Sequence, residues 1–83
     1  MVDKKTILVV DDDQAINLLL VNSLSIKFNA VSAFSGSEAI AYCSEQKPNA
    51  ILLDVNLGDI DGRDVCTTLK NEYGSSTPPI IFI

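Results

Sequence analysis

The feature that most constrains the fold is a set of four short apolar runs that do not alternate with polar residues. Continuous runs of this length are typical of strands that are covered on both faces, which is the situation in a parallel sheet. The second run contains a serine, which predicts an edge strand. The runs are Ile7–Val10, Ala30–Ala33, Ala50–Leu53 and Ile80–Ile83.

Segments with helical period separate these runs, so strand and helix alternate along the chain. This alternation predicts an α/β protein whose parallel strands are joined by right-handed crossovers. A chain of 83 residues suffices for one domain and buries only about 60 to 65 % of its unfolded surface. We therefore expect residues 1–83 to form a single unit.

Each predicted helix has an apolar face and boundary signals. The first is expected to leave Asn17 outside its core stripe, which is Ile16, Leu19, Leu20, Leu24 and Phe28. The second is expected to begin at a capping box formed by Ser35 and Glu38. The third is expected to follow an N-cap at Asp61 and to end at Gly74. Its core face is predicted to be Val65, Cys66, Leu69 and Tyr73.

The charge balance excludes two classes of function. Six lysines and arginines against eleven aspartates and glutamates give a net charge of −5, and the chain has no histidine. A basic nucleic-acid surface and histidine catalysis are therefore both excluded. The apolar stretch near the start is too short for a secretory signal or a membrane span, which indicates a cytoplasmic protein without a membrane partner. Cys43 and Cys66 form no CxxC pattern, so we expect two core thiols.

Aspartates collect directly after two of the predicted strands. Asp11, Asp12 and Asp13 follow the first apolar run, and Asp54 follows the third. If the strand order is 2-1-3-4, these strands are neighbours, and ligands bind beyond the carboxyl ends of strands where the order reverses. Unit charges about 4 Å apart repel by about 4 kcal/mol at an effective dielectric of 20, so the cluster needs a cation or a proton. Hard oxygen ligands with room for water favour Mg²⁺.

Three other interpretations of these aspartates explain less. Helix capping accounts for Asp13 and leaves the other aspartates unexplained. A calcium loop beginning at Asp54 would need glycine at its sixth position and glutamate at its twelfth, where Asp59 and Val65 stand. A phosphatase of the haloacid-dehalogenase type would need a second aspartate two residues after the nucleophile, where Asn56 stands.

Three segments together resemble the receiver domain of two-component response regulators. They are Ile7–Asp13, Ala33–Ala39 and Asp54–Gly62, and the resemblance spans the whole chain with its spacing intact. The resemblance implies a flavodoxin-like, doubly wound parallel sheet of order 2-1-3-4 that lacks the fifth strand and the last helices. Residues 1–83 would then be a single, partial receiver domain.

The same resemblance implies a role for each site residue. Asp54 would be the phosphoacceptor, taking a phosphoryl group from a sensor histidine kinase or a phosphotransfer protein. Asp12 would bind Mg²⁺ directly, and Asp11 would bind it directly or through water. Asp54 and the backbone carbonyl of Asn56 would complete the set of metal ligands.

Two departures from the family pattern are visible in the sequence. The family usually has proline where Gly58 stands, which predicts a loop that is freer to move. The family also carries a hydroxyl residue after its fourth strand, and a lysine and an aromatic residue near its fifth. We expect none of these within residues 1–83, because the chain ends at Ile83.

Two functions follow as hypotheses. The first is phosphorelay signalling, in which Mg²⁺-dependent self-phosphorylation and dephosphorylation of the parent domain are relayed to an output domain, with no turnover of an external substrate. The alternative is a non-catalytic, receiver-derived module for interaction or assembly. The apolar run Ile80–Ile83 has no following strand to pair with, which predicts self-association or pairing with another chain's strand.

Overall fold

The computed structural model describes residues 4–83, in which strands and helices alternate as predicted. Residues 1–3, which belong to the predicted domain, lie outside the described residues. The strands are β1 (Thr6–Val10), β2 (Asn29–Ala33), β3 (Ala50–Leu53) and β4 (Ile80–Phe82). The helices are α1 (Gln14–Leu24), α2 (Gly36–Glu45) and α3 (Gly62–Tyr73), and a short 3₁₀ turn, η1 (Gly74–Ser76), follows α3. Within residues 4–83, no helix has the length and apolar character that a bilayer crossing requires.

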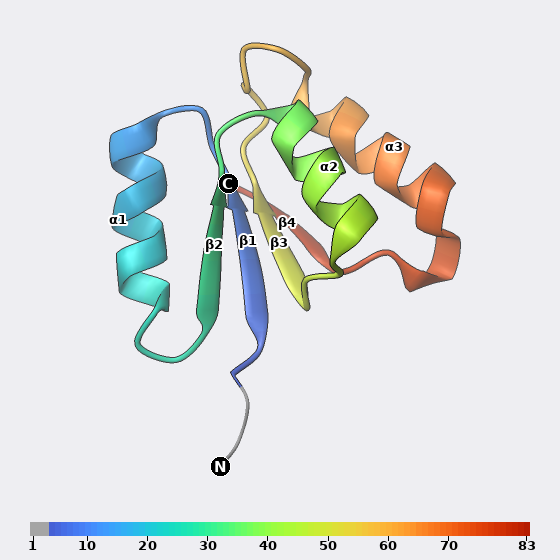
Figure 1. The fold of residues 1–83 in the computed structure, drawn as a ribbon. Coiled ribbons are helices and arrows are strands. Elements are labelled where there is room, and N and C mark those ends of the chain that lie inside the picture. The colour runs from blue at the N-terminus through green and yellow to red at the C-terminus, as the bar shows by residue number, and fades with distance from the viewer. Residues whose placement is uncertain (1–3) are drawn as a thin grey trace.

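The strands form one parallel sheet in the order β2-β1-β3-β4, which confirms the predicted order. β2 lies at one edge, as the serine in its run predicted, and β4 lies at the other. Figure 1 shows α1 on one face of the sheet, with α2 and α3 together on the other. The chain is therefore a three-layer α/β structure in which two helices cover one face and one helix covers the opposite face.

The main core lies between the sheet and the pair α2 and α3. Because side chains alternate across a strand, Leu8 and Val10 of β1 face the same side as Ile51 and Leu53 of β3. The other buried members of this core are Ala33, Ala39, Cys43, Leu57, Val65, Cys66 and Leu69. Both cysteines are free and buried, as predicted. This layer packs against β1 and β3, which lie side by side, and the acidic residues follow those two strands.

The helix boundaries follow the predicted capping residues. Asp13, Ser35 and Asp61 are the N-caps of α1, α2 and α3, and each side chain accepts a hydrogen bond from a backbone N–H in the first turn. Gly74 ends α3 with a φ of 56°, in the region where glycine has no steric penalty. A residue adjacent to each helix in the sequence therefore marks where that helix begins.

The prediction for α1 is confirmed for Leu20, Leu24 and Phe28, which are half-buried, but it is wrong for the rest of the stripe and for Asn17. Ile16 and Leu19, expected in the core, are 47 % and 65 % exposed, whereas Asn17 is fully buried. The buried and half-buried positions of this segment are Asn17, Leu20, Val21, Leu24 and Phe28. Because α1 is apolar around most of its circumference, hydrophobic period cannot select one face. A stripe based on hydrophobicity also excludes the polar residue that lies deepest.

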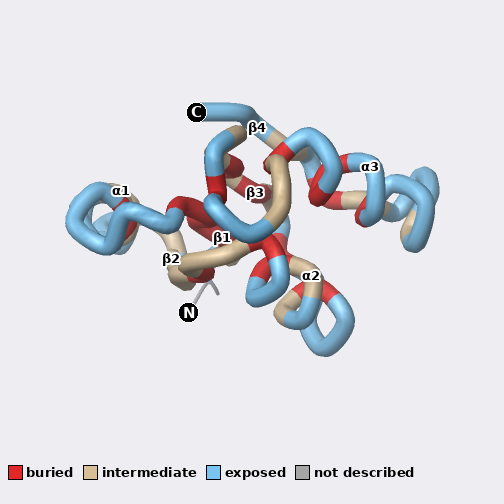
Figure 2. The backbone as a smooth tube through the Cα atoms, turned by 90° about the horizontal axis from the view of Figure 1, so that it is seen from above, coloured by how far each residue is buried: buried red, intermediate tan, exposed pale blue. Residues whose placement is uncertain are grey.

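Helix α1 covers the β2 and β1 side of its face and leaves β3 and β4 open, as Figure 2 shows from above. On this open part Leu52 of β3 lies beside Ile81 of β4, and Ile81 is 54 % exposed. On the opposite face Phe82 lines an open pocket of about 530 Å³ with Cys66 and Lys70 of α3. Within the described residues, β4 is therefore exposed on both faces and along one edge.

Candidate functional site

The pairing of β1 with both of its neighbours brings the acidic residues together. The backbone N–H of Asp54 donates to the carbonyl of Val10 at 2.9 Å, and the N–H of Asp11 donates to the carbonyl of Ala33 at 3.1 Å. Because the strands are parallel, their carboxyl ends lie at the same edge of the sheet. The structure therefore places Asp11, Asp12 and Asp54 at one point, where the strand order reverses.

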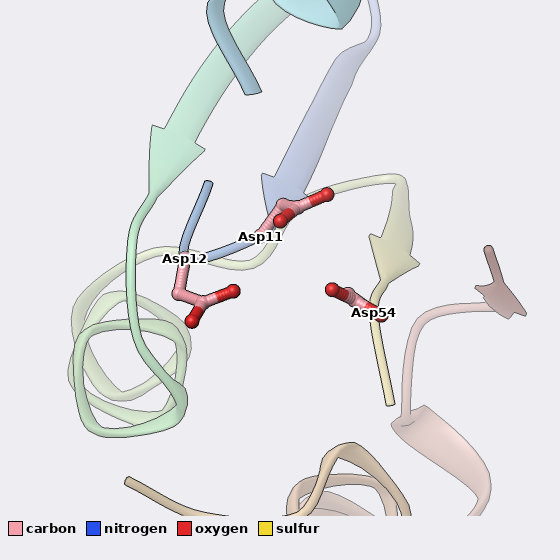
Figure 3. Close-up of side chains that lie close together, drawn as sticks. All are labelled: Asp11, Asp12 and Asp54. Atoms are coloured by element: carbon pink, nitrogen blue, oxygen red, sulfur yellow. The ribbon is translucent and has the colours of Figure 1, made fainter. Parts of the chain in front are cut away.

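The three carboxylates share one small space. One oxygen from each of Asp11, Asp12 and Asp54 lies within 4.8 Å of the others. Figure 3 shows the carboxylates of Asp12 and Asp54 directed toward each other from the ends of β1 and β3. Asp11 is buried, Asp54 is half-buried and Asp12 is exposed. We name this group the acidic pocket; it is open to solvent on the Asp12 side.

Electrostatics in the acidic pocket disfavour the charged form of Asp11. Burial raises the pKa of the Asp11 carboxyl above its ordinary value, the hydrogen bond from the N–H of Asp13 opposes this, and the charges of Asp54 and Asp12 add to it. A bound cation would offset both the burial and the repulsion. The donor set consists of hard carboxylate oxygens, which suit Mg²⁺ or Ca²⁺ rather than a soft transition metal.

Asn56 lies in the loop between β3 and α3, which we name the 54–61 loop. Its backbone N–H donates to the Asp54 carboxylate at 3.3 Å, and it forms an isolated bridge with Asp61. The structure thus places Asn56 next to the predicted phosphoacceptor. The metal-binding role of its carbonyl remains a prediction.

Two glycines permit the 54–61 loop to pass close to the carboxylates. Gly58 has a φ of 84°, and a β-carbon there would lie 3.4 Å from an oxygen of Asp12. Proline holds φ near −65° and could not adopt this backbone. A β-carbon at Gly62 would collide with the backbone carbonyl of Asp54. Glycine at position 62 therefore allows α3 to begin directly against the predicted acceptor.

Asp59 has a role that the sequence analysis missed. Its carboxylate accepts hydrogen bonds from the N–H of Gly36 at 3.0 Å, from the N–H of Ser37 at 3.1 Å and from the Ser37 hydroxyl at 2.9 Å. The two backbone donors belong to the first turn of α2, where helical N–H groups have no partner within the helix. The bond from Gly36 is the largest of the contributions that lower the pKa of Asp59 to about 2. Because the donors lie more than twenty residues away, no local pattern signals this cap.

The sequence that forms the sheet and the acidic pocket matches a known family. The family model for the response regulator receiver domain matches residues 7–83. The chain belongs to the response regulator receiver domain family. The assignment of this receiver chain therefore rests on residues 7–83 and not on the aspartates alone.

Curated relatives are longer than this receiver chain. It is similar to the probable transcriptional regulator ycf27 of Cyanophora paradoxa, with 40 % identity over 83 residues that cover 99 % of this chain and 34 % of the relative. It is also similar to the alkaline phosphatase synthesis transcriptional regulatory protein PhoP of Bacillus subtilis, with 39 % identity over 69 residues that cover 82 % of this chain and 29 % of the relative. The receiver chain thus spans about a third of the length of these relatives.

Solved receiver structures have the same fold. The receiver chain is similar to the phosphorylated cyanobacterial phytochrome response regulator RcpA, with a TM-score of 0.83 and 29 % identity. The match covers 95 % of this chain and 64 % of that chain. The similarity in fold therefore extends over nearly all of residues 1–83.

We expect Asp59→Ala to lower the midpoint of thermal unfolding by several degrees at pH 7, because two N–H groups of α2 lose their acceptor. The folded-state pKa of Asp59 is about 2. The stabilisation by its carboxylate is therefore present above the unfolded pKa and lost as the pH falls toward 2. The difference between variant and unsubstituted protein should shrink over that interval. Circular dichroism melts from pH 7 to pH 2 test this, with Glu72→Ala as the charge-matched control; a constant difference across this range would contradict it.

We expect Asp11→Asn to raise the unfolding midpoint in chelator at pH 7. The substitution removes a charge that burial disfavours, and the asparagine oxygen can still accept from the N–H of Asp13. Since the folded-state pKa of Asp11 is raised, the advantage of the variant over the chelated unsubstituted protein should shrink as the pH falls toward that pKa. The variant should also lose most of its stabilisation by Mg²⁺. Thermal melts with and without Mg²⁺ measure both effects, with the exposed Asp64→Asn as control; a less stable Asp11→Asn protein in chelator would disprove the expectation.

Proposed function

We propose that this receiver chain accepts a phosphoryl group on Asp54 in a phosphorelay. The observation that carries the proposal is the convergence of Asp11, Asp12 and Asp54 at the edge where the strand order reverses. Membership of the receiver family supports it. The proposed donor is a phosphohistidine on a sensor histidine kinase or a phosphotransfer protein, and the proposed location is the cytoplasm.

Mg²⁺ is the proposed cofactor. Asp11, Asp12 and Asp54 would hold it with their carboxylates, and Asn56 would contribute its backbone carbonyl. The fit rests on hard oxygen donors within 4.8 Å of one another and on the raised pKa of Asp11. When bound, the cation would supply positive charge that lets an anionic phosphoryl group approach three carboxylates.

The proposed chemistry needs position more than a general base. An Asp54 carboxylate oxygen attacks the phosphorus, the new oxygen–phosphorus bond forms, and the bond to the histidine nitrogen breaks with its electron pair left on the imidazole. The N–H of Asn56 holds the Asp54 carboxylate in place at 3.3 Å. The product is a phosphorylated protein, so each chain would be modified once per signal and no external substrate would be turned over.

Residues 1–83 are proposed to be one partial receiver domain, coupled to an output that lies beyond them or on another chain. Two observations support this proposal. The family model matches residues 7–83. The two curated relatives described above are named as a probable transcriptional regulator and a transcriptional regulatory protein. Each is about three times as long as the part of it that matches this chain.

Acetyl phosphate with Mg²⁺ is expected to add one phosphoryl group to Asp54 and none to an Asp54→Asn variant. Peptide mapping by mass spectrometry locates the adduct, and Asp64→Asn, which changes an exposed aspartate on α3, should be modified like the unsubstituted protein. Modification should be slower in residues 1–83 than in a complete receiver domain, because the resemblance to the family implies that the lysine and the hydroxyl residue that hold the phosphoryl oxygens lie outside residues 1–83. Equal modification of Asp54→Asn would refute the acceptor role.

A second candidate function is assembly through β4. Its support is the exposure of Ile81, Phe82 and Ile83, which are 54 %, 45 % and 48 % exposed. An apolar strand at the edge of a sheet is a template for pairing with another chain. We propose that residues 1–83 self-associate through this edge.

The 83-residue chain is expected to sediment as a dimer or a larger assembly at low micromolar concentration. Ile81→Lys should shift it toward monomer, because a charged side chain on an edge strand opposes strand addition. Ile26→Lys is the matched control, since Ile26 is 79 % exposed and lies in the connection between α1 and β2. A stable monomer formed by the unsubstituted chain would refute the assembly proposal.

A further inference from the structure

Asn17 is a fully buried polar side chain in the first half of α1. Its Nδ2 amide group donates to three backbone carbonyls: Ala33 at 2.9 Å, Asp11 at 3.0 Å and Val9 at 3.2 Å. Since the group has two hydrogens, the three carbonyls share them. One side chain therefore joins a helix to the ends of two strands.

The three carbonyls all lie around the first residue of the acidic pocket. Val9 is near the end of β1, Asp11 is the first residue after that strand, and Ala33 ends β2. The Ala33 carbonyl also accepts the N–H of Asp11. The backbone of Asp11 is thus hydrogen-bonded at both its N–H and its carbonyl. Asn17 supplies the donor to the carbonyl.

The side-chain oxygen of Asn17, Oδ1, is not stabilised by these hydrogen bonds. Throughout residues 4–83 its Oδ1 has no hydrogen-bond partner, although it is buried. A buried acceptor without a donor costs free energy that an apolar side chain of similar shape would not. The hydrogen bonds that the buried Asn17 side chain makes within the described residues are therefore the three to the backbone carbonyls.

We propose that Asn17 is a positioning residue for the acidic pocket. By holding the Asp11 carbonyl against the ends of β1 and β2, it fixes the direction of the turn that carries the carboxylates of Asp11 and Asp12. It thereby sets the affinity of the pocket for a divalent cation, in the way that partners of metal ligands do in other sites. This inference rests on the proposed Mg²⁺ site, and it assigns to Asn17 no contact with the cation.

The alternative is that Asn17 only anchors α1, and a matched control on the same helix distinguishes the two roles. Leu24→Ala loosens α1 at its far end, because Leu24 is half-buried on the inward stripe and is remote from the turn. Asn17→Leu removes the donors at nearly constant volume. Both variants are compared with the unsubstituted protein by two measurements. These are thermal unfolding in chelator and Mg²⁺ titration followed by NMR.

We expect Asn17→Leu to weaken Mg²⁺ binding by about tenfold or more. The backbone amide signals of Asp11 and Asp12 should also shift in the absence of metal. Leu24→Ala should lower the unfolding midpoint and leave the Mg²⁺ affinity unchanged. If Asn17→Leu binds Mg²⁺ as tightly as Leu24→Ala does, the positioning role is wrong while the metal site stands. If the unsubstituted protein binds no Mg²⁺ in the acidic pocket, the proposed function fails and the inference fails with it.

A measurement on the unsubstituted protein keeps the test decisive if Asn17→Leu does not fold. The side-chain amide signals of Asn17 should exchange slowly with solvent and should shift during the Mg²⁺ titration with the same midpoint as the amides of Asp11 and Asp12. The side-chain signals of Asn22 and Asn71, which are exposed, serve as internal controls. Asn17 signals that stay fixed while those of Asp12 reach saturation would overturn the proposal.

Discussion

The parallel pairing of β1 with β3 is the constraint on which the rest of the site depends. At the carboxyl end of this pairing the N–H of Asp54 donates to the carbonyl of Val10 at 2.9 Å. A slip of one residue would turn Ile51 and Leu53 out of the core and carry Asp54 away from Asp11. The burial of apolar side chains below the pocket therefore fixes the position of the charged ones above it.

Much of this arrangement could be predicted from the sequence because each signal was local or periodic. The apolar runs located the strands, and Asp13, Ser35 and Asp61 located the starts of the helices through bonds within a single turn. The convergence of the aspartates followed from the order of the strands. Neither step required a specific contact between distant side chains.

The failures have the opposite character. Asn17 and Asp59 are both held by backbone groups from another element, and the donors to Asp59 lie more than twenty residues away. For α1 the hydrophobic pattern placed Leu20 and Leu24 correctly and Ile16 and Leu19 wrongly. A helix that is apolar on several sides is oriented by its hydrogen bonds as well as by its burial. Gly58 was visible as an unusual residue, but its backbone angle became clear only from the structure.

Because Asp59 caps α2, hydrogen bonds connect the 54–61 loop directly to the first turn of that helix. The loop begins at Asp54, and its residue Asp59 accepts three hydrogen bonds from the first turn of α2. The space around Gly36 is tight, since a β-carbon at that position would lie 2.9 Å from a side-chain carbon of Val65 in α3. If the loop moves at Asp59, either the first turn of α2 moves with it or these hydrogen bonds break. A rearrangement of the 54–61 loop would therefore change the capping of α2 as well as the surroundings of Asp54.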